Sequence, residues 1–373
     1  STNMNANEVI ANRALELLGH AKGDYVHLHP NDHVNLSQST NDAYPTAVNV
    51  ALIEAIDGLA ATMETLQAAF ERKAKEFDGI LKVGRTQLQD AVPMTLGQEF
   101  RTFAVMLGED RARLIESAAL LHEVNLGATA IGTGLNAPVG YAALACAHLA
   151  RLTGRPLVTA SDLIEATQDP GAFVHLSGVL KRVAVKLSKT CNDLRLLSSG
   201  PRAGIGEITL PAMQAGSSIM PGKVNPVIPE MVNQVAFSVI GNDITVTMAA
   251  EAGQLQLNAF EPIIVRSLSE SIMHLTAACH ILAERCVDGI TANPAIMAQR
   301  LQESIGLATA LNPLIGYQAA TAVAREALAT GRTVPEIVLQ HEYLTVEELF
   351  EALRPERLAN LPTAINAAAG PRR

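Results

Sequence analysis

Long stripes of apolar residues at alternating steps of three and four constrain the fold of this chain more than any other feature of its sequence. The clearest stripe, within residues 42–77, consists of Val48, Leu52, Ile56, Leu59, Met63, Leu66 and Phe70. Similar stripes run through residues 169–197 and 261–289. Residues three and four apart share one face of an α-helix, so these stripes predict long helices. Residues 93–123 and 228–252 are predicted to form two more.

The composition supports an all-α fold. Only 3% of the residues are aromatic and none is tryptophan, whereas 48% are apolar. A core of Ala, Leu, Val and Ile suits closely packed helices better than an aromatic-rich sheet sandwich. We therefore predict a long-helix bundle domain over residues 1–290. Repeated prolines among shorter helical patterns predict a small C-terminal helical domain over residues 291–373. Such long helices need partners to cover their stripes, which predicts an oligomer.

Charge and cysteine usage exclude several classes of function. A net charge of −9 argues against binding to nucleic acid or to an anionic membrane. The four cysteines lie far apart in the sequence, which predicts buried thiols in a reducing, cytoplasmic compartment. They are Cys146, Cys191, Cys279 and Cys286. His27, His29 and His33 lie close in sequence, but no cysteine or carboxylate set accompanies them, so we expect no metal site there.

Residues 216–226, with the sequence GSSIMPGKVNP, form the most reactive-looking loop of the chain. Its glycines permit close approach to a ligand, and its serines, lysine and asparagine supply hydroxyl, ammonium and amide groups. An ammonium and glycine-loop N–H groups can also stabilise a serine alkoxide. The loop therefore suits a carboxylate ligand. The alternative is an ordinary connection that carries one solvated lysine.

Two further polar segments adjoin predicted helices. Ser39, Thr40 and Asn41 precede Asp42, which we place at the N-cap of the first long helix. The segment can serve as a cap alone, or it can also bind a carboxylate at the helix N-terminus. Residues 84–90, with the sequence GRTQLQD, are predicted to form a polar turn before a helix that begins near Pro93.

The loop at residues 216–226 matches the signature GSSxMPxKxNP of the aspartase/fumarase superfamily of lyases at every fixed position. The resemblance extends along essentially the whole chain. Several stretches are similar to the aspartase branch in particular: QSTNDAY at 38–44, GRTQLQDAVPMTLGQEF at 84–100, GATAIGTGLN at 127–136 and AAEAGQLQLN at 249–258. The chain is identified as a member of this superfamily by these motifs.

The resemblance implies that the chain reversibly deaminates L-aspartate to fumarate and ammonia through an aci-carboxylate intermediate. It implies Ser217 and Lys223 as catalytic residues, with Ser217 abstracting the Cβ proton. Substrate-binding residues follow from the same motifs. They are Ser39, Thr40 and Ser218 for the carboxylate beside the reacting carbon, Lys223 and Asn225 for the other carboxylate, and Asn41, Thr86 and Gln87 for the amino group.

The resemblance also implies a homotetramer whose active sites combine loops from three subunits around a small dicarboxylate. It implies that no cofactor is required, and it leaves activation by a divalent metal open. Family members carry an N-terminal domain, and a substrate-binding threonine precedes the position that matches Ser1. One interpretation of the start of the chain is therefore that it is the remnant of that domain. Two alternatives remain: a fumarase acting on malate, which Gln87 disfavours without excluding, and a truncated, non-catalytic helical assembly.

Overall fold

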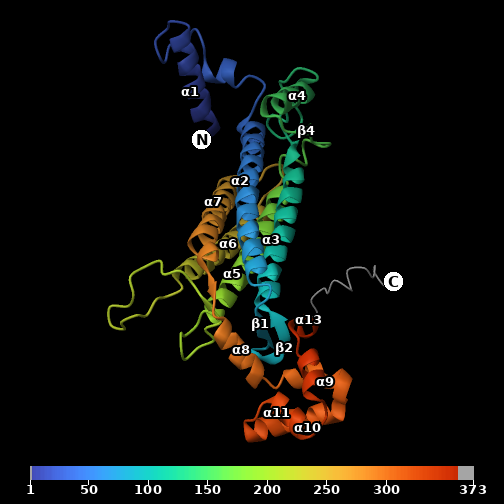
Figure 1. Cartoon of the computed structure of the whole chain (residues 1–373). Helices are drawn as coiled ribbons and strands as arrows, with labels where there is room; N and C mark the ends of the chain where they lie inside the picture. Colours follow the sequence, from blue (N-terminus) through green and yellow to red (C-terminus); the bar gives the residue numbers. More distant parts are fainter. Residues whose placement is uncertain (1, 360–373) are drawn as a thin grey trace. The chain divides into compact units, whose positions relative to one another are not determined.

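The computed structural model describes residues 2–359, and long helices dominate it (Figure 1). They are α2 (Thr40–Glu76), α3 (Leu96–Ala118), α5 (Gly171–Leu197), α6 (Val227–Glu251) and α7 (Glu261–Arg285). Shorter helices α1 (Thr2–Leu17) and α4 (Tyr141–Thr153) belong to the first half of the chain. The predicted all-α class and the five long helices are confirmed.

The chain divides into two compact units, each built from three separate segments. The first unit contains the described residues up to Glu64, with Leu107–Ser188 and Val232–His280. The second contains Thr65–Met106, Lys189–Met231 and the described residues from Ile281 onward. Each of the five long helices therefore supplies residues to both units. The predicted boundary between residues 290 and 291 stays a prediction.

The apolar stripes form the cores. All seven stripe residues of α2 are buried, the most exposed being Val48 at 7%. By length and apolar content α2 could also cross a membrane, but buried core helices pass the same test. The four cysteines are buried as predicted, and burial raises the pKa of Cys279 and Cys286 to about 12. These two thiols therefore stay protonated near neutral pH.

The second unit holds a hairpin that the sequence interpretation missed. Strands β1 (Leu81–Thr86) and β2 (Gln89–Thr95) pair antiparallel, and Pro93 lies opposite Val83. Proline is tolerated there because this sheet has only two strands, so one edge of β2 needs no donor. The predicted helix start near Pro93 is wrong. Helix α3 starts at Leu96, after a capping box in which Thr95 and Gln98 each accept the other's backbone N–H at 3.0 Å.

Shorter helices continue the second unit toward its C-terminal end. They are α8 (Pro294–Glu303), α9 (Leu307–Ile315), α10 (Tyr317–Thr330), α11 (Val334–Gln340), α12 (Val346–Ala352) and α13 (Pro355–Leu358). Thr333 and Thr345 begin α11 and α12 with capping boxes. Residues 360–373 of the predicted C-terminal domain, like residue 1, lie outside the described residues.

Minor strands complete the list of elements in the described range. In the first unit β3 (Glu123–Val124) pairs parallel with β4 (Val158–Thr159). In the second, β5 (Ile208–Thr209) pairs antiparallel with β6 (Thr291–Ala292). A short π-helix covers Pro30–Val34, and 3₁₀ turns cover Ala119–His122 and Val287–Gly289. These 3₁₀ turns replace the last residues of two helices that were predicted to be longer.

Candidate active site

The N-terminus of α2 carries three of the predicted substrate-binding residues in the first unit. The helix begins at Thr40, so Ser39 is its N-cap and the predicted N-cap role of Asp42 is wrong. The Ser39 Oγ accepts the Asn41 N–H at 3.2 Å, and Asp42 Oδ1 accepts the Ser39 N–H at 2.9 Å. The Asp42 contact is the one that the third residue makes in a capping box, while the Ser39 oxygen caps the second N–H of the helix and not the third.

Asp42 also joins this helix end to the loop at residues 127–130. Its Oδ2 accepts the N–H groups of Gly127 and Thr129 at 3.0 and 2.9 Å. The Asn41 side chain donates to the Ala130 carbonyl at 2.8 Å. The resulting segment presents Ser39 to an open depression of ≈560 Å³ that Gln38 and Asn136, among others, also line. The partial positive charge of a helix N-terminus favours an anion at such a place.

The tip of the β1–β2 hairpin carries Thr86 and Gln87 in the second unit. Thr86 pairs with Gln89, which leaves Gln87 and Leu88 as a two-residue turn. Their φ angles are +52° and +60°, the left-handed values that Asn-Gly turns normally supply. Both predicted site residues are exposed. The hairpin therefore projects Gln87 at its tip in a backbone conformation that costs energy for a side-chain-bearing residue.

A buried ionic cluster anchors the base of this hairpin. The Lys82 Nζ lies 2.8 Å from a Glu207 carboxylate oxygen and also pairs with Glu99, and Arg85 lies 2.7 Å from the other Glu207 oxygen. The side chains of Lys82 and Glu207 are only 2% and 1% exposed. The Glu207 contacts have the distance of ion pairs without the alignment of hydrogen bonds. Arg85 precedes Thr86 directly, so the cluster fixes the strand that carries the predicted residue.

The signature loop at residues 216–226 folds back on itself before α6, also in the second unit. The Ser217 N–H donates to the Lys223 carbonyl at 3.0 Å, which joins the two ends of the loop. The Ser217 Oγ accepts the N–H groups of Ile219 and Met220 at 3.3 and 3.1 Å. Two N–H donors aimed at one hydroxyl oxygen would stabilise its alkoxide. The same contacts also describe an ordinary serine turn.

The other residues of the signature loop are accessible. Ser218 and Lys223 are exposed, and Asn225 is half-buried just ahead of α6. The nine predicted site residues thus gather in three clusters: Ser39–Asn41 in the first unit, and the hairpin tip and the signature loop in the second. Their assigned roles stay predictions. Asp42 is the positioning residue that sequence reasoning missed, although Ser39-x-x-Asp42 has capping-box spacing.

Among the described residues, one group of potential metal ligands includes none of these nine. His20, Asp24 and His27 hold their ligand atoms within 4.8 Å of one another. The two imidazole rings are stacked, with centroids 3.8 Å apart and planes inclined by only 16°. Ring lone pairs lie in the ring planes, so those of nearly parallel rings do not converge on one ion. The sequence interpretation had considered His27 but neither His20 nor Asp24.

Family models match most of the chain. A model described as lyase matches residues 1–241, and one described as the fumarase C C-terminus matches residues 307–360. Aspartate ammonia-lyases from Pseudomonas fluorescens and Helicobacter pylori are 63% and 58% identical to it, over 96% of this chain. The chain spans 75% and 76% of the lengths of these two relatives.

Solved structures agree with the sequence relatives. The crystal structure of a fumarate lyase:delta crystallin from Brucella melitensis, bound to cobalt, has a TM-score of 0.93 and 59% identity, and covers 96% of this chain and 78% of its own. A class II fumarase from Schistosoma mansoni has a TM-score of 0.89 and 34% identity, with the same two coverages. The 63% and 58% identities to the two aspartate ammonia-lyases exceed the 34% identity to the fumarase. The chain therefore belongs to the aspartate ammonia-lyase family of lyases.

Proposed function

We propose that this chain deaminates L-aspartate reversibly to fumarate and ammonia, with Ser217 as the base. Identities of 58–63% to aspartate ammonia-lyases support the reaction. The observation that carries the role of Ser217 is the pair of backbone N–H groups that its Oγ accepts. These donors favour the alkoxide form that can take a proton from carbon.

The proposed reaction breaks two bonds in turn. The Ser217 oxygen takes the Cβ proton, and the C–H electron pair moves into the adjacent carboxylate to give the aci-carboxylate. That pair then returns to form the Cα–Cβ double bond of fumarate, and the Cα–N bond breaks to release ammonia. The intermediate carries an extra negative charge on one carboxylate, so donors directed at that group matter most; removing one typically costs about 10²–10³ in rate.

The predicted binding residues divide the substrate among the three clusters. Ser39 and Thr40, at the N-terminus of α2, and Ser218 would hold the carboxylate that becomes the aci-carboxylate. Lys223 and Asn225 would hold the other carboxylate. The amino group would be bound by Asn41, Thr86 and Gln87. Donors prearranged by helix and loop backbone need little reorganisation as charge develops.

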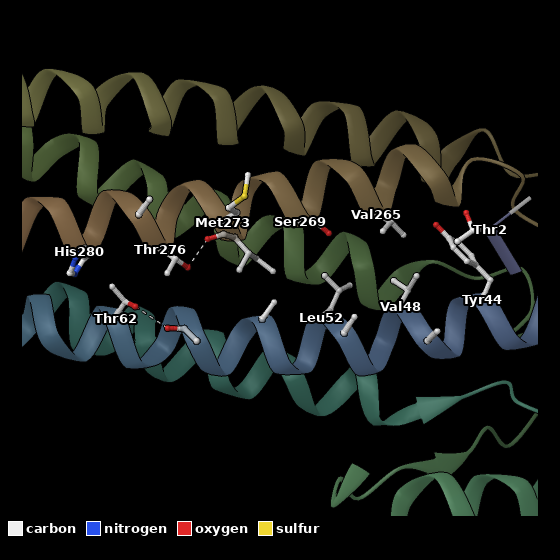
Figure 2. A pocket seen from close by; sticks show the side chains of 16 residues that line it. Thr2, Tyr44, Val48, Leu52, Thr62, Val265, Ser269, Met273, Thr276 and His280 are labelled. Carbon is white, nitrogen blue, oxygen red and sulfur yellow. Dashed lines mark hydrogen bonds between the residues drawn. The ribbon is translucent and has the colours of Figure 1, made fainter. Parts of the chain in front are cut away.

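We propose that the chain works in the cytoplasm as a homotetramer with shared active sites. The support is an open groove of ≈690 Å³ in the first unit between α2 and α7 (Figure 2). Its lining is mostly apolar and includes Ala51, Ala55 and Met273, the last 59% exposed. Small side chains beside larger apolar ones accommodate a helix from another copy, and exposed apolar patches of this kind mark association surfaces.

Fumarate formation tests the proposal. Fumarate is followed by its ultraviolet absorbance from L-aspartate and, separately, from L-malate, with the mass of the assembly checked by light scattering. Turnover of aspartate supports the ammonia-lyase. Turnover of malate alone would change the proposed function to that of a fumarase. If a well-formed tetramer forms fumarate from neither substrate, the non-catalytic assembly is favoured.

A substitution tests the base. Ser217→Ala is expected to lower the aspartate rate by about 10²–10⁴ or more, because a general base is lost. The tetramer should stay intact. Ser198→Ala, in the same unit but outside the signature loop, is the matched control and should keep the rate. Near-normal activity of Ser217→Ala would remove Ser217 from the base role.

No step above uses a cofactor. The Brucella relative was solved bound to cobalt, so the assay includes a divalent cation and a chelator as separate arms. A rate that rises with the cation and falls with the chelator would add a metal to the proposal. Equal rates in both arms would keep the reaction metal-free.

A further inference from the structure

Asp42 carries a buried carboxylate that has no cationic partner among residues 2–359. The residue is 0% exposed. Its Oδ1 accepts the Ser39 N–H at 2.9 Å, and its Oδ2 accepts those of Gly127 and Thr129 at 3.0 and 2.9 Å. Burial raises the pKa of this carboxyl, while the backbone donors act in the opposite direction. Burying a charge is costly unless it is hydrogen-bonded, and these three N–H donors supply that compensation.

The loop that Asp42 holds has a conformation that does not form readily by itself. Gly127 has φ +93°, and a Cβ there would lie 2.5 Å from the Ala142 Cα. Thr129 has φ +60°, which is unusual for a β-branched side chain. Strained backbone of this kind persists only where surrounding contacts fix it. The Asp42 carboxylate supplies such contacts to both residues.

Two further hydrogen bonds centre on Asn41. Its amide donates to the Ala130 carbonyl at 2.8 Å. Its own carbonyl accepts from the Asn125 amide at 3.0 Å. Asn41 is thus held on both sides by segments more than 80 positions away in sequence, while Asp42 next to it holds Ser39 and the loop.

We infer that Asp42 is a positioning residue for the lyase reaction: it clamps the N-terminus of α2 to the loop at residues 127–130, so that Ser39, Thr40 and Asn41 meet the substrate as a preformed set. The inference rests on the proposed function, which gives these three residues their substrate contacts. Asp42 itself touches no substrate. Its effect is transmitted through the backbone of Ser39 and through the loop.

The variant Asp42→Asn keeps the size of the side chain and changes only its hydrogen-bonding groups. It therefore tests the clamp without creating a cavity. An amide has one acceptor end and one donor end, whereas both ends of the Asp42 site face N–H donors. One of the two segments must therefore lose its contact, and the substrate residues shift. A displacement of about 1 Å from productive geometry can cost about 10²-fold in rate.

Asp243→Asn is the matched control. Asp243 is also buried in the first unit, at 7% exposure, and accepts from Ser177 Oγ at 2.8 Å and Lys181 Nζ at 2.5 Å. This variant should lose comparable thermal stability with kcat/KM for aspartate within about twofold of wild type. Asp42→Asn should lower kcat/KM by about 10²-fold and raise KM, measured well below its melting temperature. Equal kcat/KM for the two variants would overturn the inference.

A second variant tests the clamp in case the Asp42→Asn protein does not fold. Asn125→Ala removes the amide that holds the Asn41 carbonyl and leaves Asp42 in place. It should also raise KM, by less than Asp42→Asn does. An unchanged KM in Asn125→Ala would count against a clamp around Asn41.

Two further measurements do not depend on turnover. They therefore distinguish a wrong inference about the clamp from a wrong proposed function. Hydrogen–deuterium exchange of a peptide covering residues 125–132 should be slow in wild type and Asp243→Asn and faster in Asp42→Asn. Succinate, an unreactive four-carbon dicarboxylate, should bind Asp42→Asn more weakly in calorimetry. If wild type does not turn over aspartate, the proposed function fails and the exchange arm still decides the clamp. Unchanged exchange in Asp42→Asn would overturn it.

Discussion

Glu261, the first residue of α7, carries a carboxyl group whose pKa burial raises from 4.5 to about 7. It lines a cavity of ≈110 Å³ with the acidic groups of Glu123, Glu165 and Asp169. Burial raises the pKa of the Tyr44 hydroxyl, and the charge of the nearby Glu261 carboxylate raises it further. The folded state therefore holds the Glu261 proton more tightly than the unfolded chain does.

The sign of the pH effect follows from that difference. The stability that the bound proton contributes is fully present below pH 4.5 and is lost as pH rises through about 7. Glu261→Gln removes the ionisation, so it should be more stable than wild type by about 1–3 kcal/mol at pH 8 and nearly equal at pH 5. Urea unfolding at fixed protein concentration measures both values. Glu270→Gln on the same helix is the control, and a gap between Glu261→Gln and wild type that does not widen from pH 5 to pH 8 would contradict the raised pKa.

Some residues of the candidate site could be predicted from local sequence patterns and others could not. The polar set at Ser39–Asn41 and the signature loop stood out because their side-chain chemistry is concentrated within a few positions. Asp42 was misplaced as an N-cap because its real partners, Gly127 and Thr129, lie 85 and 87 positions away. No local pattern encodes a hydrogen bond across that separation. The capping-box spacing of Ser39 and Asp42 was the signal that could have corrected the helix start.

At the scale of elements, the hairpin that carries Thr86 and Gln87 depends on buried charges. Glu207→Gln would leave Lys82 and Arg85 short of a counter-charge, and breaking a buried pair from one side costs about 3–5 kcal/mol. The free energy of unfolding in urea should fall by that order. Asp288→Asn is the matched control, because its ion pair with Arg72 is exposed and should be worth under about 1 kcal/mol. If the two variants lose the same free energy of unfolding, burial does not strengthen the ion pairs of the Glu207 cluster.

The elements differ in how far the sequence predicts them. Long helices were predicted because their stripes repeat over many turns, and their burial confirms the pattern. The hairpin was missed because its turn uses Gln87 and Leu88 at positive φ, without the Asn or Gly that marks such turns. The capping box of Thr95 and Gln98 was the signal that α3 starts after Pro93.

At the scale of the whole molecule, the groove between α2 and α7 predicts how assembly and activity are linked. Met273→Glu would place a charge on its apolar lining, which disfavours contact with another copy. The side chain is 59% exposed in the single chain, so folding should be spared. Light scattering should report species smaller than a tetramer, and aspartate turnover should fall with them because the proposed sites are shared.

Leu328→Glu provides the control for this groove variant. Leu328 is 70% exposed on α10 of the second unit and lies outside the groove. Its variant should keep both mass and turnover. A Met273→Glu protein that stays tetrameric and fully active would exclude the groove as the association surface.

The division of both units into three separated segments has a consequence for synthesis on the ribosome. The last segment of the first unit ends at His280, and the second unit needs residues beyond it. At about 5–20 residues per second, making residues 1–280 alone takes roughly 15–55 s. Until then the emerging chain exposes apolar stripes whose partners have not been made. Neither unit can be completed before His280 is made, so nascent chains of this protein should depend on chaperones until that point.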